Sequence, residues 1–199
     1  MKKKSIIASL IILAVLLLDQ GVKLWVKSTM IEGESLHVFN WFYIHFAENS
    51  GMAFSMELPG SYGKIALSVF RLFAIAGIGY WVVDLIRKNA PIGLVCCAAG
   101  IFAGATGNLL DSAFYGLIFT DSYGRVAELF PAQGYAGFLL GNVVDMLYFP
   151  LIHGKFPTWL PIWGGEYFEF FRPIFNVADS AITVSVAMML LFQKRFFAE

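Results

Sequence analysis

Carboxyl and amide side chains lie at the ends of long apolar stretches, where they could carry out chemistry at a membrane surface. Asn176 and Asp179, three residues apart, open one such stretch, and Asn108 and Asp111, also three apart, close another. Asp145 lies within the apolar segment NVVDM. A carboxyl group near hydrocarbon is costly unless it is paired or protonated, so these aspartates are candidates for a functional site.

Two aspartates that converge could hydrolyse a peptide bond. When a pair shares one proton, one member is ionised and the other is protonated at the same pH. The ionised carboxylate takes a proton from the attacking water, and its partner donates one to the developing oxyanion. We predict that Asp145 and Asp179 form this pair, which needs no metal and no cofactor. Spacing alone leaves simpler roles open, because Asp179 could only cap a helix and Asp111 could only end one.

Other chemistries find little support in the sequence. The three histidines, His37, His45 and His153, have no metal-ligand spacing such as HExxH, and no GxSxG segment offers a serine nucleophile. The formal net charge is zero and no basic stripe is present, which argues against a nucleic-acid partner. The two cysteines, Cys96 and Cys97, are adjacent in an apolar stretch and are expected to be small buried hydrophobes.

The elements that position these residues are expected to be membrane-spanning helices. Hydrophobic residues make up 58% of the chain and charged residues 14%. Four apolar stretches are long enough to cross a bilayer: about 5–26, 65–83, 92–110 and 177–192. The first could instead be a cleavable signal peptide, but no small-residue cleavage site follows Leu18. The sequence therefore predicts an all-α membrane protein with four transmembrane helices.

The basic residues predict the orientation of these spans. Lys2 to Lys4 precede the first, Arg87 and Lys88 join the second to the third, and Lys194 and Arg195 follow the fourth. Because cytoplasmic flanks retain cations, both termini are expected in the cytoplasm. Two regions, about 27–64 and 111–175, then lie outside.

Smaller patterns predict how the spans are held and what covers the site. Asp19 and Lys23, four residues apart, could form an ion pair on one helix face. A ridge of Ala99, Ala103 and Gly107 would let a neighbouring helix approach closely. The aromatic segment 36–46, with residues 37, 39, 41, 43 and 45 on one face, predicts a strand pair or curled sheet. It could cradle an extended peptide or only rest on lipid headgroups.

Five segments in order resemble a known family. They are DQGVK at 19–23, NSGMAF at 49–54, GATGNLLD at 104–111, NVVDM at 142–146 and FNVADSAI at 175–182. Together they resemble lipoprotein signal peptidase, also called signal peptidase II, a family of membrane aspartic peptidases. FNVADS is specific, whereas DQxxK alone would be weak.

The resemblance implies roles for particular residues. Asp145 and Asp179 match the catalytic aspartates, and Asp19 and Lys23 would brace the first helix. Residues that would shape the site or hold substrate are Asn49, Gly51, Asn108, Asp111, Asn142 and Asn176. The family removes the signal peptide of prolipoproteins just before a diacylglyceryl-modified cysteine, and globomycin-type inhibitors block it. The implied protein is a single domain over 1–199 in the bacterial cytoplasmic (inner) membrane, among lipids, with its site near the outer leaflet.

The sequence also departs from the family pattern. Ser112 follows Asp111 where the family usually has Arg, and Arg125 or Arg172 is a candidate to replace that cation. Met52 and Ser55 replace smaller residues of the second motif. Additions around 119–141 and 151–172, rich in Gly, Pro and aromatics, suggest an interfacial loop or helix insertion, either a lid or a passive loop.

Two other classes remain open from the sequence. A small ion-coupled transporter or channel subunit would use intramembrane aspartates as a relay, but it predicts inverted repeats and broken helices, which the sequence lacks. A structural scaffold would not require repeated Asp and Asn at the outer edge.

Overall fold

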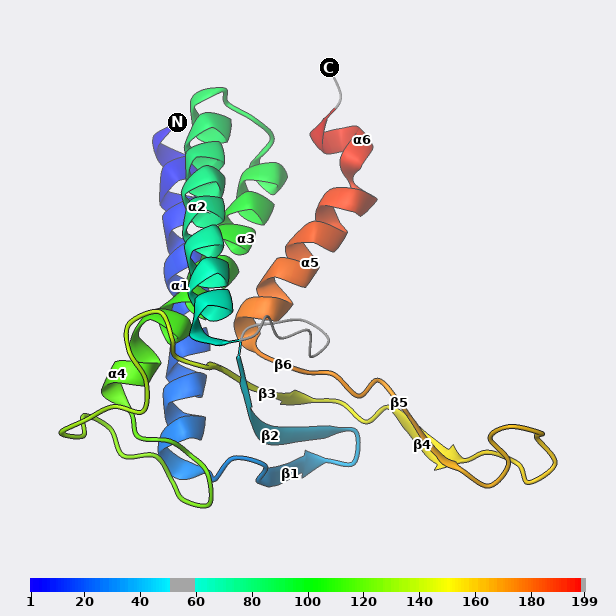
Figure 1. The fold of residues 1–199 in the computed structure, drawn as a ribbon. Helices are drawn as coiled ribbons and strands as arrows, with labels where there is room; N and C mark the ends of the chain where they lie inside the picture. Colours follow the sequence, from blue (N-terminus) through cyan, green and yellow to red (C-terminus); the bar gives the residue numbers. More distant parts are fainter. Residues whose placement is uncertain (51–59, 198–199) are drawn as a thin grey trace.

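Long helices packed around one central helix form the body of the protein (Figure 1). The computed structural model describes residues 1–50 and 60–197. Helices α1 (Lys2–Thr29), α2 (Gly60–Arg87) and α5 (Val177–Leu191) all contact α3 (Ile92–Leu110). After Phe192 the chain ends in the short helix α6 (Gln193–Phe196). The chain's N- and C-terminal ends and the turn between α2 and α3 lie at the same end of the bundle (Figure 1).

Three of these helical segments are long and apolar enough to cross a membrane, counting only the residues that the structure describes: Lys2–Thr29, Gly63–Arg87 and Ile92–Ile118. They include the first three predicted spans and extend beyond them. The fourth, α5, has 15 residues and is shorter than the other three. Large apolar side chains such as Leu17, Phe70 and Phe73 point out of the bundle, as expected of helices solvated by lipid.

The third helix does not end at Asp111. A π-helical turn (Asp111–Tyr115) and the short helix α4 (Gly116–Ile118) continue its path, so helical structure extends beyond the predicted residue 110. Asp111 and Ser112 are buried there, and the Ser112 carbonyl accepts a hydrogen bond from Gly141 N–H. Because these polar groups find partners within the protein, the helix can continue through them. Such π-helical turns are frequent at functional sites.

A small antiparallel sheet lies at the end of the bundle opposite the termini (Figure 1). Its strand order is β1 (Ser35–Phe39), β2 (Phe42–Asn49), β3 (Val143–Tyr148) and β6 (Ile174–Phe175). The strand pair predicted over 36–46 is confirmed. The prediction that residues 37, 39, 41, 43 and 45 share one face of the sheet holds only in part. His37 is paired with Tyr43 as it requires, but a register shift pairs Phe39 with Phe42. The segment around Asp145, expected in a loop, is strand β3.

A second sheet reaches sideways from the first. Strands β4 (Ile152–Lys155) and β5 (Tyr167–Phe170) form a hairpin that extends away from the helices (Figure 1). The addition at 151–172 is therefore a β-hairpin, not the expected loop or helix, because aromatic residues favour the pleated strand. Trp159 at its tip is 78% exposed. The other addition, 119–141, folds back on the protein, where Phe119 is fully buried.

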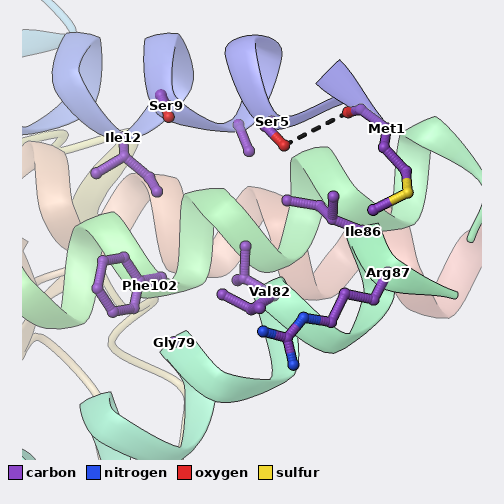
Figure 2. A pocket seen from close by; sticks show the side chains of 11 residues that line it. Met1, Ser5, Ser9, Ile12, Gly79, Val82, Ile86, Arg87 and Phe102 are labelled. Carbon is purple, nitrogen blue, oxygen red and sulfur yellow. Dashed lines mark hydrogen bonds between the residues drawn. The ribbon is translucent and has the colours of Figure 1, made fainter. Parts of the chain in front are cut away.

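A cavity of about 430 Å³ lies near the termini (Figure 2). Side chains of α1, α2 and α3 line it, among them Ile12, Val82 and Phe102, with Arg87 at its edge (Figure 2). Among the residues that the structure describes, none of the predicted site residues borders it. This cavity is therefore separate from the polar cluster described below.

Glycines of α3 allow α5 to approach closely. A Cβ atom at Gly104 would lie 2.3 Å from the Ala178 carbonyl oxygen and 2.7 Å from Ile182 Cγ1. We predict that Gly104→Ala lowers the stability of the purified protein by about 1–3 kcal/mol, because backbone must move to relieve this overlap. Thermal unfolding in detergent measures it. Gly77→Ala is the matched control, since a Cβ there meets nothing within 4 Å; equal losses in the two variants would contradict this account.

Candidate active site

A buried lysine connects the first helix to the third. Lys23 Nζ lies 2.9 Å from Asp19 Oδ2 and 2.8 Å from Asp111 Oδ2, and all three side chains are fully buried. The same ammonium donates to Asn108 Oδ1 at 2.8 Å. The spacing of four between Asp19 and Lys23, and of three between Asn108 and Asp111, places these four groups on facing sides of two helices. Removed from water, such charges require partners of this kind.

The two carboxylates around Lys23 each bond to a further element. Asp19 Oδ1 accepts from Ala178 N–H at 2.9 Å, which satisfies an amide in the first turn of α5. Asp111 Oδ2 accepts from Val144 N–H of β3 at 3.2 Å, and its Oδ1 accepts from Gln20 Nε2 at 2.8 Å. One ammonium group is thereby coupled to both elements that carry the predicted aspartate pair.

Asn176 lies between the two predicted catalytic aspartates. Its Nδ2 donates to Asp145 Oδ1 at 2.7 Å, and its Oδ1 accepts from Asp179 N–H at 2.9 Å. The Asp179 side chain in turn accepts from Asn176 N–H at 3.4 Å, which completes a capping box at the start of α5. Asp179 therefore caps α5, and it also lies close to Asp145.

Amide donors hold both carboxyl groups. Asp145 Oδ2 accepts from Asn49 Nδ2 at 3.2 Å, and Asp179 Oδ1 accepts from Asn108 Nδ2 at 2.7 Å. Asp145 is only 5% exposed. Burial, followed by the nearby negative charge of Asp179, raises the pKa of Asp145 to about 7. The structure thus brings two carboxyl groups together, one of which favours its protonated form.

Not every predicted residue joins this cluster. Asn142 Nδ2 donates to Glu48 Oε2 at 2.7 Å, and its Oδ1 accepts from Lys64 at 2.6 Å. Glu48 also pairs with the buried Lys27. Asn142 therefore belongs to a neighbouring ion network that includes Glu48 of β2. Gly51, together with Met52 and Ser55, lies outside the described residues.

Arg71 is the cation that the sequence analysis missed. Its Nη1 lies 3.5 Å from Ser112 Oγ, a side chain of the π-helical turn beside Asp111. An arginine within an apolar span is itself a signal of function, so the sequence contained the clue. The proposed substitute Arg125 instead pairs with exposed Asp121 and is 59% exposed, and Arg172 is also exposed. The structure contradicts the suggestion for Arg125.

A groove of about 380 Å³ opens beside Asp179. Its lining is mostly apolar or aromatic, with Phe171, Phe175, Thr183 and Val184 alongside Asp179 and Ser180. The groove therefore joins an apolar surface to the carboxyl cluster. In the part of the chain that the structure describes, no group of three or more His, Cys, Asp and Glu residues is arranged to hold a metal ion.

Comparison with known proteins identifies the family. The model of the family described as signal peptidase (SPase) II matches residues 11–195. The chain belongs to the signal peptidase II family. This assignment confirms the resemblance of the five segments, and the protein is a signal peptidase II type hydrolase. It also removes the reason to consider a transporter or scaffold.

Individual relatives agree with this assignment. The lipoprotein signal peptidase of Porphyromonas gingivalis is 49% identical over 192 residues, which cover 96% of this chain and 83% of the relative. That of Amoebophilus asiaticus is 34% identical over 91% of this chain and 75% of its own. A solved bacterial membrane enzyme shares the fold, with a TM-score of 0.60 and 25% identity over 94% of this chain and 91% of that structure.

We predict that Lys23→Ala lowers stability by about 3–5 kcal/mol, because it leaves the buried carboxylates of Asp19 and Asp111 without their cation. Unfolding of the purified protein in detergent measures the loss. Lys88→Ala is the control, since Lys88 is 72% exposed and pairs with Asp84 at the surface; it should change stability little. A Lys23→Ala variant as stable as Lys88→Ala would contradict the role assigned to the buried ion pairs.

Proposed function

We propose that this signal peptidase II removes the signal peptide from prolipoproteins by using Asp145 and Asp179 to hydrolyse the bond just before a diacylglyceryl-modified cysteine. The observation that supports the proposal most directly is Asn176, which bonds to both aspartates and brings β3 and α5 together. Two carboxyl groups held side by side can share one proton, as an aspartic peptidase requires.

In the proposed reaction, the ionised member of the pair takes a proton from the attacking water. The protonated member donates to the carbonyl oxygen as its bond to carbon becomes single, and proton transfer to the amine then releases the new N-terminus. The raised pKa of Asp145 keeps a protonated carboxyl group available near neutral pH. Asn108, Asn176 and Asn49 fix the two carboxyl groups, so little reorganisation is needed during the reaction.

The proposed substrate suits the surfaces around the pair. The apolar groove beside Asp179, with Phe171, Phe175 and Val184, offers a place for an acyl chain. The sheet that carries Asn49 and Asp145 lies at the same end of the protein and could cradle the extended peptide. Lipid and peptide would then reach the carboxyl groups from different sides. Globomycin-type inhibitors are expected to occupy this same site.

The proposed membrane placement is a single domain with four spans and both termini in the cytoplasm. Both termini and the turn after α2 lie at one end, where the basic residues predicted to be cytoplasmic also lie, and the sheet lies at the other (Figure 1). Helix α5, with α6, runs between these ends as the fourth span. The site then lies near the outer leaflet of the bacterial inner membrane, with the aromatic hairpin β4–β5 at the lipid surface.

Cleavage of a diacylglyceryl-modified prolipoprotein peptide tests the proposal. Asp145→Asn and Asp179→Asn should each lower kcat by on the order of 10²–10⁴-fold, because each removes a proton-transferring group. Asp121→Asn is the control, since Asp121 is exposed and pairs only with Arg125 among the interactions described. A chelator should leave wild-type activity unchanged. If Asp145→Asn or Asp179→Asn folds and keeps full activity, the catalytic role proposed for that aspartate is wrong.

The pH dependence gives an independent check. Asp145 is protonated in the folded protein up to a pKa of about 7, whereas an unfolded Asp loses its proton near pH 4. The folded state therefore binds more protons in this window, and stability should fall as the pH rises from about 4 to about 7. The value of kcat/KM should fall above about pH 7 for the same reason. Asp145→Asn should flatten the stability profile measured by thermal unfolding; an unchanged slope would contradict the raised pKa.

A further inference from the structure

The cavity near the termini opens between two helices that both pack on a third. Helices α1 and α2 pack along α3, whereas their contacts with each other are few. Small residues line the space between them, with Ser5 and Ser9 on α1 and Gly79 across from them on α2 (Figure 2). The volume of about 430 Å³ lies in the range of small-molecule sites, roughly 300–1,000 Å³. The gap between α1 and α2 is therefore large enough to hold a ligand.

The walls of this cavity favour an apolar ligand. Ile12, Val82, Val83 and Phe102 contribute aliphatic and aromatic surface, and Val83 is 45% exposed. Water gains little in such a space, because it finds too few hydrogen-bond partners. Helices α1 and α2 are both long and apolar enough to cross a membrane. In a bilayer, the apolar group that surrounds such helices is the acyl chain of a lipid.

Arg87 stands at the edge of this apolar space. It follows Val83 by four residues and therefore lies on the same face of α2. Its side chain extends back along the helix toward Val82 (Figure 2). Arg87 is exposed, and its guanidinium forms no hydrogen bond or ion pair with the residues that the structure describes. A guanidinium group in this position can bind a phosphate.

The charges around Arg87 favour an anionic partner from outside the chain. Asp84 is the single acidic residue of α2 and α3, and it pairs with Lys88 at 2.8 Å. Lys4 of α1 donates to the backbone carbonyl oxygens of the turn between α2 and α3. The one carboxylate of α2 and α3 is thus already paired, whereas the charge of Arg87 is not.

We propose that this cavity binds an acyl chain of an anionic phospholipid and that Arg87 contacts the phosphate of the same molecule. The apolar walls and the cation then match the two parts of one amphipathic ligand, as basic pockets between membrane helices do. The site lies at the end of the bundle opposite the sheet, away from the proposed peptidase site (Figure 1). That the lipid comes from the cytoplasmic leaflet rests on the proposed membrane placement.

The test is lipid binding by the whole protein in detergent, measured by native mass spectrometry. The probes are phosphatidylglycerol and phosphatidylethanolamine with identical acyl chains, which differ in net charge. Wild type should bind phosphatidylglycerol more tightly. Arg87→Gln should weaken that binding about fivefold, the effect of one cation at an anionic lipid, and should bring the two affinities together. Lys88→Gln is the matched control, since Lys88 is the next residue, is 72% exposed and lies outside the cavity lining.

A second pair of variants tests the place of the acyl chain. Ser9→Phe puts an aromatic ring into the cavity and should abolish binding of both lipids. Leu10→Phe is its control, since Leu10 is 59% exposed and does not line the cavity. Glycerol phosphate, which has the phosphate group but no acyl chain, should not displace phosphatidylglycerol.

Three results would overturn the proposal. They are equal affinities of wild type for the two lipids, equal losses in Arg87→Gln and Lys88→Gln, and lipid binding that survives in a folded Ser9→Phe variant. Displacement by glycerol phosphate would likewise overturn it, in favour of a simple anion site. If Ser9→Phe does not fold, the two charge variants and the competition decide. Binding is measured without a peptide substrate, so an inactive wild type would count against the proposed function and not against this site.

Discussion

The ion pairs of Lys23 are the interaction on which the remaining geometry depends. The groups that contact this ammonium bond to two further elements of the site. Asp19 and Asn108 bond to the first turn of α5, and Asp111 bonds to the backbone of β3. A buried ion pair contributes little net stability compared with apolar packing, because desolvation offsets the attraction. Its contribution here is geometric, since its bonds connect α1, α3, α5 and β3 through one buried group.

Close packing and the polar cluster require one another. A Cβ at Gly107 would lie 2.7 Å from Asp19 Oδ2, and one at Gly104 would overlap the Ala178 carbonyl. Small residues on α3 therefore let Asp19 of α1 and the start of α5 meet across it. In lipid, where apolar side chains gain little by leaving the solvent, such close contacts and hydrogen bonds are the main source of helix association. The same glycines thus serve the packing and the site.

Local patterns predicted the parts of the fold that depend on nearby residues. The long helices follow from the length of the apolar stretches. The strand pair near His37 and Tyr43 follows from a spacing of two residues, and the pairing of Asp19 with Lys23 from a spacing of four. The approach of Asp145 to Asp179 does not, because strand pairing and Asn176 bring together positions far apart in the sequence. That expectation came from the family motifs. The hairpin β4–β5 was missed because an aromatic, glycine-rich segment has no clear period.

The fold also separates residues that lie in one sequence motif. Asn142 is only three residues from Asp145, yet it bonds to Glu48 and Lys64 in a different network. Arg71 shows the reverse, since no motif contains it and its described hydrogen bond is to Ser112 on another element. A single charged residue in an apolar span indicates function, but only the packing of α2 against α3 shows which groups it serves.

The two aspartates are chemically identical, so their environments must make them different. Asp145 lies on a strand, is almost fully buried, and has neutral amides of Asn49 and Asn176 as its donors. Asp179 lies at a helix N-terminus, is less buried, and accepts from the side-chain amide of Asn108. The first environment disfavours the anion, which raises the pKa of Asp145. A strand and a helix that meet at one asparagine thereby place two identical carboxyl groups in different surroundings, as the proposed acid and base roles require.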